Sequence, residues 1–141
     1  MKNLNSTTLT VFALAATFGL ASAVAAEDAA VKLPPASDKQ GVTYAANVKP
    51  LLDASCVKCH SGDKPKARLK LDNLENALKG SKDGKVIIAG DSAKSLLVLA
   101  AAHATKDHDQ WMPPPHNKAG AKPLTPEQIG LIRAWIDQGA K

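Results

Sequence analysis

The sequence is poor in aromatic residues, which make up 4% of its 141 residues although 45% are hydrophobic. Aromatic side chains supply much of the buried volume in small cores, so a core built from this chain alone would bury little apolar volume. Strand-like patterns are also nearly absent, the one candidate being KVIIA over residues 85–89. We therefore predict an all-α domain with long ordered loops, which leaves space for a non-protein group at its centre.

Long hydrophobic runs are confined to the beginning of the chain. Lys2 precedes an apolar run over residues 9–20, and small residues follow over 21–26. This run is shorter than the ~20 residues of a membrane-spanning helix, and the pattern is typical of a cleaved secretory signal. We predict a signal peptide over residues 1–26, no transmembrane anchor, and a periplasmic or otherwise extracytoplasmic location.

Positive charge exceeds negative charge only mildly. The formal net charge is +5, from 18 Lys and Arg against 13 Asp and Glu. Dense basic clusters of the kind that bind nucleic acid are absent, so nucleic acid is not an expected partner. Five cations lie close to the cysteines, and they form either a positive rim that attracts acidic partner proteins or an ordinary solvated loop: Lys58, Lys64, Lys66, Arg68 and Lys70.

The folded part is expected to begin near Gly41. Residues 27–40 carry charges and a Pro-Pro pair without apolar periodicity, which predicts a flexible or extended leader before a single domain over residues 41–141. Pro50 either kinks the first helix or starts a second turn. That helix is predicted from four apolar residues that share one face and lead toward the cysteines: Tyr44, Val48, Leu51 and Leu52.

Two short helices are indicated in the middle of the chain. Asp72 with Glu75 resembles a capping box before the sequence LENALK, and Gly80 suits the end of that helix. Asp91 or Ser92 is the expected cap of the next helix. This helix carries a leucine cluster: Leu96, Leu97 and Leu99.

The last helix has the clearest start signal in the chain. Thr125 at the N-cap, Pro126 at the first helical position and Gln128 at the third combine three features of helix starts. Gly139 suits its end. The face expected to pack into the core contains five large residues: Ile129, Leu131, Ile132, Trp135 and Ile136.

Both cysteines lie in one short motif, CVKCH, over residues 56–60. A thioredoxin-type dithiol would lack its strand-helix-strand setting, and a zinc site would need further ligands from irregularly spaced histidines. A disulfide across three residues would stabilise little.

Covalent haem attachment, in contrast, uses every residue of this motif. Cys56 and Cys59 add to the two vinyl groups as thioethers, and His60 offers an imidazole nitrogen to the iron. The secretory signal agrees with this chemistry, and a buried porphyrin would supply the apolar volume that the core lacks. We therefore predict one covalent haem c, with His60 on one side of its iron.

Met112 is the candidate for the other side of the iron. It is the only methionine after the predicted signal, and Trp111 and three prolines flank it. The prolines restrict the backbone, which favours a loop that holds a thioether at the iron; filling a gap in the core is the alternative. Three histidines are rival ligands, and any of them would give a lower potential than a His/Met pair: His103, His108 and His116.

These segments resemble the monohaem c-type cytochromes, and among them the planctomycete-type cytochrome c domain, from about Tyr44 to Lys141. The similar segments are VKPLLDASCVKCH, RLKLDNLENALKG, IIAGDSAKSLL, WMPP and LTPEQIGLIRAWIDQGA. The resemblance implies a class I cytochrome c-like helical bundle around the haem, in which the helix before Cys56 crosses the last helix. It also implies His60 and Met112 as the axial ligands. The segment AGDS over residues 89–92 departs from the Pro-Gly-Asp-Pro turn that is frequent in the family, and this difference affects only a loop.

The resulting expectation is a soluble electron carrier and not an enzyme. An iron with ligands on both sides cycles between Fe(II) and Fe(III) while oxygen and peroxide stay off it. A peroxidase-like enzyme would instead need an open iron site and an acid-base residue, for which His108 or His116 is the candidate. A haem sensor and a subunit of a larger oxidoreductase are further alternatives.

Overall fold

A computed structural model describes residues 32–141. The predicted signal peptide lies outside these residues. The fold over residues 32–141 is helical and contains no β-strand, as the composition predicts; its one bridge joins Ser81 and Gly84. Residues 85–89 are irregular. No helix in this part of the chain has the length and apolar character needed to cross a membrane.

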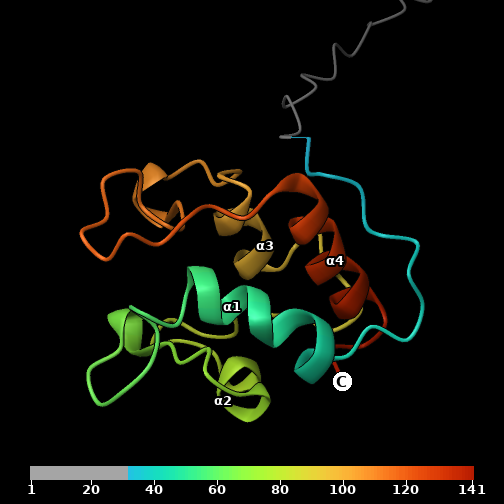
Figure 1. The fold of residues 1–141 in the computed structure, drawn as a ribbon, viewed down its shortest axis with the longest axis horizontal. Helices are drawn as coiled ribbons and strands as arrows, with labels where there is room; N and C mark the ends of the chain where they lie inside the picture. Colours follow the sequence, from blue (N-terminus) through green and yellow to red (C-terminus); the bar gives the residue numbers. More distant parts are fainter. Residues whose placement is uncertain (1–31) are drawn as a thin grey trace, which may run out of the picture. The chain divides into compact units, whose positions relative to one another are not determined.

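Four α-helices and three short helical turns follow one another along the chain (Figure 1). All four predicted helices are present. Pro50 lies in the first turn of α1, directly after a π-helical turn, so it starts a second helical segment. The elements are η1 (Tyr44–Val48), α1 (Lys49–Ser55), η2 (Lys66–Arg68), α2 (Leu74–Lys79), α3 (Leu96–Ala101), η3 (His108–Gln110) and α4 (Pro126–Asp137).

The starts of α2 and α3 differ from the prediction. The N-cap of α2 is Asn73, whose side-chain oxygen accepts a hydrogen bond from the Asn76 backbone N–H at 2.8 Å. Asp72 instead accepts a hydrogen bond from the Asn76 side chain. Helix α3 begins after Ser95, so neither of the two predicted caps, Asp91 and Ser92, occupies its N-cap position.

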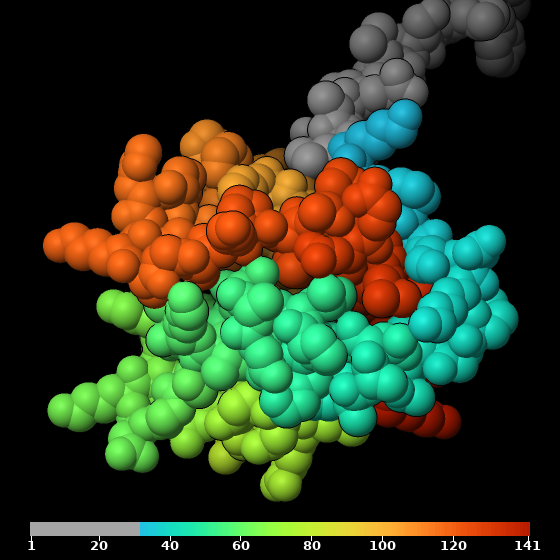
Figure 2. All heavy atoms as spheres, in the orientation of Figure 1, coloured from blue at the N-terminus to red at the C-terminus, as the bar shows by residue number. Residues whose placement is uncertain are grey.

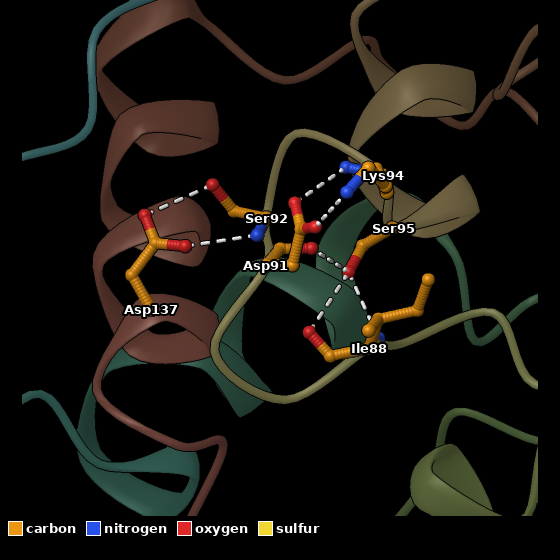
Figure 3. A network of polar contacts seen from close by, with 6 residues as sticks. All are labelled: Ile88, Asp91, Ser92, Lys94, Ser95 and Asp137. Atoms are coloured by element: carbon orange, nitrogen blue, oxygen red, sulfur yellow. Dashed lines mark hydrogen bonds and ion pairs between the residues drawn. The ribbon is translucent and has the colours of Figure 1, made fainter.

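Asp91 and Ser92 shape the turn that precedes α3 (Figure 3). Asp91 accepts a hydrogen bond from the Lys94 backbone N–H, and the Ser95 hydroxyl donates to the Asp91 carbonyl. The buried Ser92 donates from its N–H and its hydroxyl to the two carboxylate oxygens of Asp137, at 2.8 and 2.9 Å. The turn is thereby attached to the end of α4.

Helix α4 forms the centre of the core. Its capping box is formed by Thr125 and Gln128, as predicted. Trp135 is fully buried, and its ring lies 5.7 Å from that of Tyr44 in η1, so the start of the first helix packs against α4. The Trp135 indole N–H donates to the carbonyl of Lys141, which satisfies its one polar atom.

Residues 32–40 lie along α4 (Figure 1). The Ser37 N–H donates to the Gly130 carbonyl at 2.9 Å, the Arg133 guanidinium donates to the Pro34 carbonyl, and the Gln138 amide donates to the Lys39 carbonyl. These contacts join α4 to main-chain groups of the leader. The domain boundaries at residues 26 and 40 stay predictions.

Gly130 makes this close approach possible. A Cβ atom at this position would lie 2.5 Å from the Pro35 carbonyl oxygen, which is closer than nonbonded atoms allow. We expect Gly130→Ala to displace the leader while α4 stays helical, because alanine favours the helix interior by about 1 kcal/mol over glycine. Limited trypsin digestion at Lys39 checks this, and a cleavage rate equal to that of the wild type would contradict it.

Candidate functional site

The motif over residues 56–60 continues from the end of α1 as a series of tight turns. The Cys56 N–H donates to the Leu52 carbonyl at 2.8 Å, and the N–H groups of Cys59 and His60 both donate to the Cys56 carbonyl, at 3.1 and 3.0 Å. These bonds keep the helical spacing of the motif beyond the last residue of α1. All three predicted attachment residues therefore belong to one compact piece of backbone.

One cavity brings together the four predicted site residues. Its walls contain Cys56, Cys59 and His60 from the first half of the domain and Met112 from the second half, followed by two prolines. The cavity is small, with a volume of about 30 Å³, and it is partly open to solvent. On the face shown in Figure 2, the green segment that follows α1 lies directly against the orange segment that contains Met112.

The three rival histidines do not line this cavity. His103 and His108 instead contact the ring of Trp111, with centroid distances of 4.9 and 4.0 Å. His116 is exposed in the loop after Met112. The geometry thus brings Met112, and none of these histidines, to the cavity that His60 lines.

A hydrogen bond joins the two sides of the cavity, and others order the loop after Met112. The Lys58 ammonium donates to the Ala119 carbonyl at 3.2 Å, which joins the cysteine motif to the loop after Met112. Asn117 in that loop donates to the carbonyls of Pro114 and Ala121 and accepts from the Ala121 N–H. Asn117 also lines the cavity. No motif or periodicity in the sequence marks it.

Backbone hydrogen bonds connect the segment around His60 to residues 66–71, which in turn contact η1. The Leu71 N–H donates to the His60 carbonyl at 2.8 Å, and the Lys66 N–H donates to the Cys59 carbonyl at 3.0 Å. The Tyr44 hydroxyl donates in turn to the Leu71 carbonyl. The motif is therefore connected through residues 66–71 to the aromatic pair at the centre of the core.

Burial sets the protonation of the motif. It lowers the pKa of His60, which favours the neutral imidazole that can coordinate a metal. Burial, with a smaller contribution from the neighbouring Cys59, raises the pKa of the Cys56 thiol to about 12. A redox-active dithiol needs a lowered thiol pKa, so this environment argues against the thioredoxin-type alternative.

The residues present fit a covalently held haem. His60 is buried and lines the cavity, and burial favours its neutral imidazole, the form that binds iron. Two thiols, an imidazole and a thioether form the donor set of a c-type haem with a His/Met pair. Within residues 32–141, no three His, Cys, Asp or Glu side chains are grouped as a metal site, which leaves the zinc alternative without its ligand set there.

A comparison with protein families supports the haem interpretation. Residues 56–116 match the family model described as Planctomycete cytochrome C. The matched region begins at the first cysteine of the motif and extends past Met112, so it includes both sides of the cavity. No match was found among curated proteins or solved structures.

Proposed function

We propose that this chain, whose residues 56–116 match the family model described as Planctomycete cytochrome C, is a soluble, extracytoplasmic electron carrier with one covalent haem c. The observation that supports this most directly is the shared cavity of the cysteine motif and Met112. When bound, the haem supplies an iron that cycles between Fe(II) and Fe(III).

The four predicted site residues have separate roles in this proposal. Cys56 and Cys59 would hold the haem through two thioether bonds to its vinyl groups. His60 and Met112 would be the two protein ligands of the haem iron, in a class I cytochrome c fold. The hydrogen bonds around residues 66–71 and Asn117 keep these side chains in place, so that little rearrangement accompanies the change of charge.

The proposed location follows from the predicted signal peptide over residues 1–26. Haem attachment to a CVKCH motif takes place outside the cytoplasm, so export of the chain and maturation of the site belong to the same compartment. We propose the periplasm, or another extracytoplasmic space, as this compartment.

The electrochemistry of the purified protein tests the carrier proposal. We expect a reversible one-electron wave and slow binding of carbon monoxide to the reduced protein, because Met112 competes for the distal position. Rapid carbon monoxide binding together with turnover of peroxide would contradict the carrier role and support the enzyme alternative. That alternative lacks an acid-base histidine other than His60 in the cavity, since neither His108 nor His116 lines it.

We further propose that acidic redox proteins dock on a basic surface beside the cysteine motif. Four cations from two segments line one groove, and a backbone bond from the Lys82 N–H to the Ala67 carbonyl holds the segments together. Of the four, Lys82 is paired with Asp83. Two of the cations, Arg68 and Lys70, belong to the positive rim predicted from the sequence. The other two, Lys79 at the end of α2 and Lys82 after it, are added by the fold.

Charge reversal tests this surface. Arg68→Glu with Lys79→Glu should slow the oxidation of the reduced protein by ferricyanide about tenfold at low ionic strength, because the attraction of the anion is lost. The difference should shrink as salt screens the charges. The matched control, Lys32→Glu with Lys39→Glu, changes the net charge equally but lies in the leader. Equal rates for the two double variants would contradict a role for the groove.

A further inference from the structure

His103 ends α3 in a backbone conformation that suits glycine better than histidine. Its φ of 54° lies in the left-handed region. The His103 N–H donates to the Ala100 carbonyl at 3.1 Å, and the Ala104 N–H donates to the Leu99 carbonyl at 2.8 Å. This is the Schellman helix end, in which glycine normally occupies the left-handed position. A histidine is less favourable for the backbone here, so its ring needs a compensating role.

The imidazole of His103 stacks on the indole of Trp111. The two ring planes are almost parallel, at 4°, with their centroids 4.9 Å apart. His108 contacts the same indole at 4.0 Å, and the indole N–H donates to the Thr105 carbonyl at 3.3 Å. Trp111 is therefore fixed by ring contacts and by one hydrogen bond.

The backbone connects this stack to Met112. The Met112 N–H donates at 3.0 Å to the carbonyl of Ala100, the group that also accepts from the His103 N–H. Met112 directly follows Trp111, and its side chain lines the cavity with His60. The indole that His103 stacks on therefore belongs to the residue next to the one that carries the thioether.

A hydrogen bond at Nε2 does not explain the ring of His103. Its Nε2 atom is buried and has no hydrogen-bond partner within residues 32–141. The ring also does not line the cavity. Its stacking on the indole is the ring contact that the structure shows for this histidine.

We propose that His103 is a positioning residue, whose ring holds Trp111 so that the Met112 thioether faces the cavity. This inference rests on the proposed His60/Met112 ligation. Removal of the ring leaves the thioether present but less well oriented. Ligands from solution then compete with Met112 more effectively at the iron.

Titration of the ferric holoprotein with imidazole measures this competition. His103→Gly deletes the ring and suits the left-handed backbone, so the fold should persist. We expect imidazole to bind His103→Gly about twofold to tenfold more tightly than the wild type, the range that corresponds to the loss of one aromatic contact. His103→Phe keeps a stacking ring without the unpaired nitrogen, and its affinity for imidazole should stay close to that of the wild type.

The outcomes separate this inference from the proposed function. If the wild type lacks the weak absorption band of a methionine bound to ferric iron, the proposed ligation is wrong and the inference fails with it. If the wild type has the band but His103→Gly binds imidazole with unchanged affinity, the inference alone is wrong. The inference is also wrong if His103→Phe changes as much as His103→Gly. His103→Asn, whose side chain tolerates left-handed backbone, repeats the test should the glycine variant unfold.

Discussion

Replacing both Cys56 and Cys59 by alanine is expected to abolish covalent haem attachment. The two thiols are the only cysteines in the sequence, and both line the cavity that His60 shares. Acid-acetone extraction of the denatured variant should therefore remove all haem, while the wild type keeps it. Haem that stays with the double variant after extraction would contradict the assignment of the motif.

The single variants refine this expectation. Cys56→Ala and Cys59→Ala each leave one thiol for a thioether, so extraction should leave haem on whatever protein matures. His116→Ala is a control, because His116 is exposed and lies outside the cavity lining. This variant should keep as much covalently attached haem as the wild type.

Met112→Leu is expected to open the distal side of the iron. Leucine has similar volume and keeps the packing, but it lacks the thioether sulfur. The methionine-to-iron absorption band should disappear, and the reduction potential should fall by about 0.1 V or more, within the ~0.8 V span that axial ligands set. Optical spectra and voltammetry of the holoprotein measure both changes.

The leucine variant also distinguishes a ligand from a gap-filling methionine. If Met112 only fills the core, leucine should preserve both the spectrum and the potential, since volume-conserving apolar substitutions cost little. A variant with the wild-type band would therefore contradict the ligation. His108→Ala serves as the comparison, because His108 contacts Trp111 and not the cavity.

Local helix signals could be predicted from the sequence where a single segment contains them. The Thr125 and Gln128 capping box requires only neighbouring residues, and it forms as expected. At α2 the same reasoning selected Asp72, because Glu75 lies three residues later, yet Asn73 caps the helix. Both side chains offer an oxygen acceptor, and the backbone course before the helix decides which one meets a free N–H.

The position of the leader could not be predicted in this way. Its contacts with α4 use the carbonyls of Pro34 and Lys39 and the N–H of Ser37, groups that almost every residue carries. The close approach at Gly130 depends on two segments that are distant in sequence. Apolar periodicity contains no information about such main-chain packing.

The sequence predicted some residues of the candidate site but not others. The cysteine motif predicted three candidate residues because the chemistry depends on their spacing, and the count of methionines predicted Met112; all four line one cavity. Asn117 and the proposed positioning role of His103 could not be predicted, since they depend on a loop bond and a ring stack that only the folded chain brings together. The sequence made His103 a candidate for the iron ligand; in the structure its ring stacks on Trp111.

The mass of the purified, denatured protein tests the central claim most directly. Covalent attachment predicts that the protein from a host able to mature c-type cytochromes is heavier by one haem. The peptide that contains Cys56 and Cys59 should carry the added mass. The same peptide with two free thiols and no added mass would contradict the claim.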